Sequence, residues 1–558
     1  MKKASIIICN NNYIAKAIVS LKLFRSKNQD YDLYILGTVF SKISHELAKK
    51  HNITLLEKNL KNDFFNLDKR PYGLQYPIEC FYRFYIPVIL HDYDYVVVIE
   101  PDIYTNKSLD IKLEEIEYIA GSFNSSKKIN GYTPIMKDIP TWQEHTNIKF
   151  HLEQNRVLGG ISIFNIKNLN KINFYQKICN LYKKSWDLNV PRCGDDSLLV
   201  LFQSIHPQYF KLYPNHFHTI EEENINMIPK ITFFHSVGKY TKYWTNKSPY
   251  NEINKYFNQK WTEYLYNHFD LDFIKRYYQD IFINIEKVKL TFYYYQKTHN
   301  FGDMLMPYIL KKISKQENYT VDFEENNKAK ILGIGSIMRL AHKNTIVCGA
   351  GIRDKNQDIK YTNALFVRGP HTRNNLLQRD IYTPPVYGDC GLLLPDFYTP
   401  NFTKKYKLGI IPHYVDYSKV LELYGNKSDI LIIDVKEPNI ERTIKKIAKC
   451  EKIISSSLHG LIISDAYNIP NKWIKFSNNI NGDDIKFHDY FLSVKRVDKT
   501  PIINFDDILE TNHITNLIQP VQIEFNKKEL QEILFYNKNG FTNYIKYLFA
   551  KLQKDNNK

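Results

Sequence analysis

The sequence has few of the features that mark secreted, membrane-spanning or zinc-binding proteins. Its seven cysteines in 558 residues are scattered and form no C-x-x-C pair, which argues against a disulfide scaffold or zinc module and favours a reducing compartment. The longest apolar runs are too short to cross a bilayer. The start, MKKASIIICNNNY, has only a short apolar stretch, which predicts a first strand rather than a signal peptide. We therefore expect a cytoplasmic protein.

Acidic residues are too few to balance the basic ones. The 76 Lys and Arg against 59 Asp and Glu give a net charge of +17, which is typical of proteins that bind nucleic acid or anionic membranes. The sequence has no RNA-binding aromatic signature, zinc finger or basic zipper region. A bias toward Lys, Asn, Ile and Tyr, all with A/T-rich codons, also accounts for the charge. We expect no nucleic-acid partner, and a basic binding protein stays as an alternative.

The length predicts two or three domains. Short apolar runs alternate with helical segments in both halves, which predicts an α/β fold with mostly parallel sheets. The expected strands are residues 4–9, 32–37, 53–56 and 94–100, then 288–295, 329–335, 344–351, 364–369, 406–413, 429–435 and 452–457.

These runs predict a first domain over residues 1–280 and a second over 286–500, built from two small Rossmann-like lobes joined around 395–405. Residues 501–558 form a predicted helical tail. Its segment 527–558 is amphipathic, which fits a helix that packs back on the protein or one that lies on a membrane surface.

Two carboxylates follow an apolar strand in the first half, at Glu100 and Asp102. Side chains at i and i+2 of an extended segment point the same way, and ligands of parallel sheets bind beyond the carboxyl ends of strands. Such a pair can share a hard divalent cation that holds a diphosphate. Without further residues, an acidic turn explains the pair equally well.

The segments around this pair have the order and spacing of a known family. They are FYRFYIPVIL (81–90), VVVIEPDIY (96–104), VLGGISIFNIKNL (157–169), CGDDSLLVLF (193–202) and ITFFHSVGKYTKYW (231–244). Together they resemble glycosyltransferase family 8, whose members are retaining transferases with a GT-A fold. The resemblance covers roughly residues 4–265.

The resemblance implies a UDP-sugar donor and a site for Mn²⁺ or Mg²⁺. The metal ligands would be Glu100, Asp102 and His235. Gly238 and Lys242, with Lys239 as a competitor, match the diphosphate-binding residues, Arg83 matches a donor-site basic residue, and Asp195 with the catalytic Asp196 matches the acceptor side. Two places depart from the family: Glu100 replaces an aspartate, and Leu158-Gly159 replace Asn-Ser.

The second half has its own candidate site at the ends of predicted strands. Asn300 to Asp303 open a helix, and a helix N-terminus beyond a strand favours anions. Arg368 and Arg373 are suited to bidentate recognition of carboxylate or phosphate. His459 stands between an apolar strand and a helix, where an imidazole can do acid–base work. Taken singly, these residues would more often be a helix cap, surface arginines and a buried histidine.

Together, NFGDMLMPYIL (300–310), VRGPHTR (367–373), YGDCGLLLP (387–395) and SSSLHGLIISDAYNIP (455–470) resemble the polysaccharide pyruvyl transferase family. The resemblance covers about 288–495. It implies a fold similar to GT-B glycosyltransferases and transfer of pyruvate from phosphoenolpyruvate to two sugar hydroxyls, as a cyclic ketal.

In that reaction His459 would protonate the methylene carbon of the donor, Asp303 would orient the acceptor or act as base, and Arg368 with Arg373 would hold the donor anion. Asn300, Ser457 and Leu458 are predicted to line the substrate site. Many members have Arg where this chain has Ser457, so a phosphoenolpyruvate contact is either missing or supplied elsewhere, with Arg339 and Lys452 as candidates.

The sequence thus predicts a bifunctional enzyme of glycan assembly with nucleotide-sugar, phosphoenolpyruvate and glycan-acceptor partners. One alternative is a glycosyltransferase whose second half is a degenerate acceptor-binding module. Another is a basic protein that binds nucleic acid or a membrane. Peripheral membrane contact, through the basic surface or the C-terminal helix, is compatible with the first reading as well.

Overall fold

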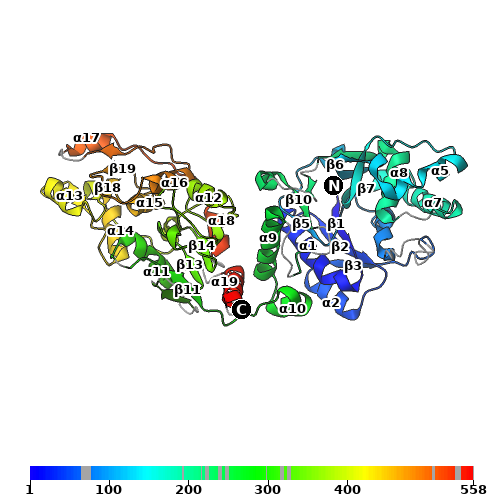
Figure 1. The fold of residues 1–558 in the computed structure, drawn as a ribbon, viewed down its shortest axis with the longest axis horizontal. Helices are drawn as coiled ribbons and strands as arrows, with labels where there is room; N and C mark the ends of the chain where they lie inside the picture. The colour runs from blue at the N-terminus through cyan, green and yellow to red at the C-terminus, as the bar shows by residue number, and fades with distance from the viewer. Residues whose placement is uncertain are drawn as a thin grey trace. The chain divides into compact units, whose positions relative to one another are not determined.

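The computed structural model describes the chain except residues 65–76, 191–193, 215–216, 220–224, 237–241, 246–250, 297, 314–318, 323, 325–327, 505–508, 535–541 and 557–558. The described residues form two compact units, Met1–Ile281 and Phe282–Lys558 (Figure 1). Each unit has its own sheets and core, and each is described by itself.

The first unit is built on a seven-stranded sheet. Its order is β3 (Thr54–Glu57), β2 (Asp32–Gly37), β1 (Lys3–Ile8), β4 (Tyr95–Ile99), β7 (Asn155–Asn165), β6 (Ile119–Lys128) and β8 (Phe210–Tyr213). The first four strands run parallel, whereas β7 is antiparallel to both β4 and β6. The sheet is therefore mixed.

A small second sheet begins where β4 ends. It consists of β5 (Ile103–Thr105), β10 (Phe233–His235) and β9 (His218–Thr219), with β10 in the middle. The turn of residues 100–102 joins β4 to β5, and β10 runs antiparallel to β5 with His235 opposite Ile103. This pairing places His235, the last residue of β10, near the carboxyl end of β4, although the two are far apart in the sequence.

Helices cover the first sheet and contribute to its core. They are α1 (Ile14–Lys27), α2 (Lys42–Lys50), α3 (Ile86–Ile89), α4 (Thr133–Met136), α5 (Ile139–His145), α6 (Ile166–Lys171), α7 (Phe174–Asp187), α8 (Asp195–Ile205), α9 (Glu252–His268) and α10 (Leu271–Tyr277). The 3₁₀ helix Ile78–Tyr85 precedes α3 and carries Arg83. Phe81, Trp142 and Leu198 are among the side chains that pack into the core between these elements.

The second unit contains two five-stranded parallel sheets. The first has the order β12 (Tyr319–Asp322), β11 (Leu290–Tyr293), β13 (Lys330–Leu332), β14 (Thr345–Cys348), β15 (Asn363–Phe366). The second has the order β17 (Ile430–Ile432), β16 (Tyr406–Ile411), β18 (Cys450–Ser455), β19 (Asn471–Lys475), β20 (Ile502–Ile503). All their pairings are parallel.

The helices of this unit are α11 (Phe301–Ile313), α12 (Pro370–Leu377), α13 (Tyr417–Tyr424), α14 (Ile440–Ala448), α15 (Leu458–Ala466), α16 (Ile485–Ser493), α17 (Thr511–Asn516), α18 (Lys527–Leu534) and α19 (Asn543–Asn556). One large core takes side chains from strands of both sheets, such as Phe292 of β11 and Ile453 of β18. The two sheets therefore share this core, and each also has a smaller buried cluster of its own, with Val347 of β14 in one and Ile410 of β16 in the other.

The predicted α/β class is confirmed, and a strand overlaps every segment expected to hold one. Several strands, such as β11 and β17, are shorter than their apolar runs because the ends of those runs turn into loops. Residues beyond 500 contribute the edge strand β20 and the helices α17 to α19.

The C-terminal helix α19 packs back on its own unit. Ile545 and Phe549 are 0% exposed and belong to the core of that unit, and Tyr544 is 3% exposed. The apolar face of the amphipathic segment is thus buried. Among the described residues, no helix combines the length and the apolar character that a bilayer span requires.

Candidate active sites

Three side chains converge at the carboxyl end of β4. Glu100 follows this fully buried strand, and its backbone N–H donates to the carbonyl of Gly160 on β7. Asp102 precedes β5, and the pairing of β5 with β10 brings His235 beside it. The Nε2 atom of His235 is 3.2 Å from Glu100 Oε2 and 3.1 Å from Asp102 Oδ1.

This cluster has the donor set of a divalent cation site. Glu100, Asp102 and His235 each offer one ligand atom, and these atoms lie within 4.8 Å of one another. Two carboxylates and one imidazole suit a hard or borderline cation such as Mg²⁺ or Mn²⁺. The three predicted metal ligands are therefore brought together, and their chemistry fits the predicted ion.

Arg83 gathers the acidic residues beside the cluster. Its guanidinium lies 3.2 Å from Glu100 Oε1, 3.1 Å from Asp195 Oδ2 and 3.1 Å from Asp196 Oδ1. Burial raises the pKa of Asp195 to about 7, although the Arg83 charge opposes this shift. Burial also acts against ionised Glu100, but His235 and Arg83 outweigh it and leave the pKa of Glu100 lowered. Arg83 is thus held by protein carboxylates at the edge of the cluster.

Gly159 explains one of the departures from the family pattern. A Cβ at this position would lie 2.8 Å from Asp196 Cγ and closer still to its Oδ1 atom. The Nη1 atom of Arg83 also donates to the carbonyl of Gly159, at 3.1 Å. A serine here would collide with the carboxylate, so Gly159 makes room for Asp196.

Lys242 also reaches the cluster, where its Nζ contacts Asp102 Oδ2. Burial lowers the pKa of Lys242, and the Glu100 charge acts in the opposite direction. Gly238 and Lys239 lie outside the described residues. Of the predicted diphosphate-binding residues, Lys242 is therefore the one that the structure places beside the carboxylates.

His218 was missed by sequence reasoning. It is 0% exposed, and its Nε2 atom lies 3.2 Å from His235 Nδ1. It comes from the two-residue strand β9, which has no apolar pattern of its own. Only the pairing of β9 with β10 brings the two rings together.

The second cluster lies where α15 and α11 begin. His459 is in the first turn of α15, directly after β18 and the buried serines 455–457, and is 9% exposed. A Cβ on Gly302 would lie 2.1 Å from His459 Nδ1, so the first turn of α11 rests on the imidazole. Asn300 caps this turn by accepting from the N–H of Gly302 at 3.0 Å. Ser457 and Leu458 are buried beside the histidine, with 4% and 7% exposure.

Asp389 pairs with His459, a contact that sequence reasoning did not identify. The Nε2 atom of His459 is 3.6 Å from Asp389 Oδ2, and Asp389 is 0% exposed. The Oδ1 atom of Asp389 accepts from the N–H of Gly391 at 2.8 Å, which fixes the carboxylate. The two atoms face each other beyond hydrogen-bond distance, and neither has a hydrogen-bond partner among the described residues. The segment YGDCGLL (387–393), which belongs to the family resemblance and contains Asp389, was the sequence signal for this residue.

Asp303 and Lys486 complete this cluster. Burial raises the pKa of Asp303 to about 6, and the charges of His459 and Lys486 offset part of the shift. Burial, followed by the Arg368 charge, lowers the pKa of Lys486 to about 8. Lys486 stands at the start of α16 and carries a cation that sequence reasoning missed.

Arg368 is fully enclosed by protein groups. It is 0% exposed, its Nε donates to Asp489 Oδ2 at 3.2 Å, and its Nη1 donates to Ser336 Oγ at 2.8 Å. Its Nη2 donates to the carbonyl of Ile352 at 2.6 Å. Arg373 is half-buried, and its Nε donates to the carbonyl of Thr383 at 2.9 Å. Their predicted role in donor binding stays a prediction.

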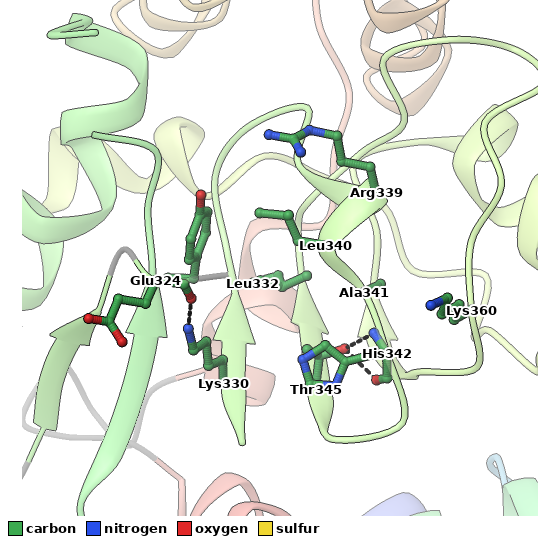
Figure 2. Close-up of a pocket in the computed structure, with 10 residues that line it drawn as sticks. Glu324, Lys330, Leu332, Arg339, Leu340, Ala341, His342, Thr345 and Lys360 are labelled. Atoms are coloured by element: carbon green, nitrogen blue, oxygen red, sulfur yellow. Dashed lines mark hydrogen bonds between the residues drawn. The ribbon is translucent and has the colours of Figure 1, made fainter. Parts of the chain in front are cut away.

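Lys452 and Arg339 are the two candidates for the contact that other family members make with an arginine in place of Ser457. The structure gives both of them other surroundings than His459. Lys452 Nζ donates to the carbonyls of Thr515 and Ile518, at 2.7 and 2.9 Å. Arg339 lines a cavity of about 170 Å³ with Lys330 and other residues (Figure 2). His459, Asp303 and Asp389 do not line this cavity.

Comparison with known proteins identifies the second half of the chain. Residues 300–478 match the sequence profile of the polysaccharide pyruvyl transferase family. The chain is 30% identical over 239 residues to the uncharacterized protein L143 of Acanthamoeba polyphaga mimivirus, covering 41% of this chain and 83% of that protein. It is 27% identical over 219 residues to the succinoglycan biosynthesis protein ExoV of Rhizobium meliloti strain 1021, covering 36% of this chain and 63% of ExoV.

Among solved structures, the chain is similar to the galactosyltransferase LgtC in complex with donor and acceptor sugar analogs. The identity is 14%, the match covers 46% of this chain and 95% of LgtC, and the TM-score is 0.35. The sequence matches carry the assignment: the chain belongs to the same family as mimivirus L143, and its residues 300–478 are a polysaccharide pyruvyl transferase domain, so the protein is a transferase.

Proposed function

We propose that the protein is a bifunctional enzyme of glycan assembly. Its first domain, residues 1–280, is a GT-A-type glycosyltransferase that uses a UDP-sugar. Its second domain, residues 286–500, has a GT-B-like arrangement of two lobes and transfers pyruvate from phosphoenolpyruvate, with residues 501–558 as a tail packed on it. We further propose a cytoplasmic location, which the few, scattered cysteines support.

In the first domain, Glu100, Asp102 and His235 would hold Mn²⁺ or Mg²⁺. The ion would supply positive charge that stabilises the departing diphosphate. Lys242 leaves Asp102 and contacts the same diphosphate, where a cation stabilises the oxyanion that develops. Gly238 is proposed to lie against the diphosphate as well.

Asp195 and Asp196 then face the sugars. Asp196 is the more exposed of the two, with a side chain 56% accessible against 10% for Asp195. We assign Asp196 the direct contact with the acceptor or reacting sugar. Arg83 holds both carboxylates in place and contributes positive charge near the donor.

In the second domain, His459 supplies a proton and Asp303 accepts one. His459 protonates the methylene carbon of phosphoenolpyruvate while the first sugar hydroxyl adds to C2 and gives its proton to Asp303. The C2–O bond to phosphate then breaks, and the second hydroxyl closes the ketal ring, its proton leaving with the phosphate. Asp303 returns its proton to His459 through solvent, so both residues are regenerated.

Asp389 keeps the imidazole of His459 oriented for this step, because a fixed buried carboxylate faces its Nε2 atom. The charge of Lys486 acts on Asp303, and Lys486 would bind the phosphate or carboxylate of the donor. Arg368 and Arg373 contribute to donor binding indirectly. Arg368 holds α16 and the loops of Ser336 and Ile352 in place, and Arg373 holds the loop of Thr383. Asn300, Ser457 and Leu458 shape the backbone around it.

The pairing of His459 with Asp389, beside Asp303, carries this proposal. The test is incubation of the purified chain with phosphoenolpyruvate, Mn²⁺, a panel of UDP-sugars and simple glycosides, with products identified by mass spectrometry and phosphate measured. We expect phosphate release that requires a glycoside. Absence of both phosphate release and sugar transfer with every glycoside would contradict the proposal.

The role of Lys486 has a matched control in Lys452. Lys486→Ala should raise the KM for phosphoenolpyruvate by about tenfold or more, because a charge-assisted hydrogen bond contributes about 1.5–3 kcal/mol. Lys452→Ala removes the same charge far from His459, since Lys452 binds the carbonyls of Thr515 and Ile518. An equal effect of the two substitutions would show that only overall charge matters.

A further inference from the structure

A chain of three buried polar side chains ends at the cation cluster. Ser122 Oγ lies 2.8 Å from His218 Nδ1, and His218 Nε2 lies 3.2 Å from His235 Nδ1. Ser122 and His218 are 0% exposed and His235 is 6% exposed. The far nitrogen of His235 is the atom that faces Glu100 and Asp102.

The hydrogen-bonded series Ser122–His218–His235 can determine which nitrogen of His235 carries the proton. The partners of His218 are a hydroxyl and another imidazole, so the ring is neutral and has one N–H and one lone pair. If His218 Nδ1–H donates to Ser122, its Nε2 accepts from His235 Nδ1–H. His235 Nε2 then presents its lone pair to the cluster, which is the form that binds a metal ion.

The local packing is built around this pair of rings. Their centroids are 5.3 Å apart with an interplanar angle of 27°. A Cβ on Gly160 would lie 2.5 Å from His235 Nδ1 and 2.9 Å from His218 Cε1. Gly160 therefore leaves the space in which the two imidazoles meet, and β9 pairs with β10 to align them.

We propose that His218, anchored by Ser122, is a positioning residue that fixes the metal-binding tautomer and orientation of His235. The proposal rests on the proposed metal-dependent activity of the first domain. Removing the outer partner of a ligating histidine typically weakens metal binding by about 10- to 100-fold. The Ser122–His218 pair therefore sets the affinity for the cation without touching it.

The test is Mn²⁺ binding by the full-length protein, measured by electron paramagnetic resonance and calorimetry without any sugar donor. His218→Phe keeps an aromatic ring but removes both nitrogens, whereas His218→Gln keeps an amide oxygen that can accept from His235. We expect the Kd for Mn²⁺ to rise by about 10- to 100-fold in His218→Phe and by less in His218→Gln. Ser122→Ala should weaken binding by several-fold and gives a milder variant if the others fail to fold.

His51→Phe is the matched control, since His51 is a largely buried histidine of the same unit that packs on Phe269 and Phe273. Melting temperatures measured in a chelator verify that each variant is folded. Unchanged Mn²⁺ affinity in folded His218→Phe, or an equal loss in His51→Phe, would overturn the positioning role alone. Absence of Mn²⁺ and Mg²⁺ binding by the unaltered protein would overturn this role and the metal-dependent function together.

Discussion

His235 in the first unit and His459 in the second are both buried histidines beside carboxylates at the end of a strand. His235 Nε2 faces two carboxylates, and its other nitrogen meets His218. His459 Nε2 faces one carboxylate, and its other nitrogen lies against the backbone of Gly302. The same side chain therefore meets two different chemical environments.

The number and exposure of the neighbouring carboxylates distinguish the proposed role of His235 as a metal ligand from that of His459 as a proton donor. Around His235, Glu100 and Asp102 supply two negative charges at one point, which favours a cation. Around His459, Asp389 is fully buried and fixed by Gly391, so it can orient an imidazole. Asp303, with a pKa raised to about 6, is a second titratable group within reach of the same reaction.

The largest effect expected is on the second site. His459→Gln removes the proposed proton donor, and phosphate release from phosphoenolpyruvate should fall by about 10²- to 10⁴-fold. His488→Gln is the control, because His488 packs at the edge of Trp473 and lies outside the described contacts of His459. Equal losses in both variants would remove the distinction between the two histidines.

Asp102→Asn should have the corresponding effect on the first site. It removes a proposed metal ligand and the partner of Lys242, so turnover of UDP-sugar should fall by about 10²- to 10³-fold. The loss should remain when Mn²⁺ is raised, and a coupled assay for UDP measures it. Asp280→Asn in the same unit, on an acidic residue away from the cluster, should leave turnover unchanged.

Asp389→Asn sharpens the comparison at the second site, since it keeps His459 and removes the charge that faces it. The Asp389 charge stabilises the protonated imidazole across 3.6 Å, and a loss of about 1.4 kcal/mol of that stabilisation should lower phosphate release by about tenfold. The fall should be mainly in kcat. A loss confined to the KM for phosphoenolpyruvate would instead place Asp389 in donor binding.

The smallest effect concerns stability. The folded-state pKa of Asp303 is raised from 3.8 to about 6. The stabilisation from binding a proton is complete below the unfolded pKa and is lost as pH rises through about 6. Asp303→Asn should therefore gain up to about 3 kcal/mol relative to the native chain near pH 8, but little near pH 4. Melting temperatures across this range check the sign, and a constant difference would contradict it.

Strands such as β4 and β18 were predictable because each is a short apolar run, whereas β9, a pair of polar residues, was not. Glu100, Asp102 and His235 were also predictable, because they stand in segments whose order and spacing resemble a family with a metal site. The structure brings their ligand atoms together. His218 and Asp389 were not assigned because their partners lie far along the chain and only strand pairing or helix packing joins them. The burial of Arg368 depends on Asp489 from the distant helix α16, which no local pattern reveals.

The central claim is that one chain has two independent transfer sites. The most direct measurement follows UDP release and phosphate release together in a reaction that contains both donors, for the native chain, Asp102→Asn and His459→Gln. We predict that Asp102→Asn loses only UDP release and that His459→Gln loses only phosphate release when each acceptor is supplied. Loss of both products in either folded variant would contradict two independent sites.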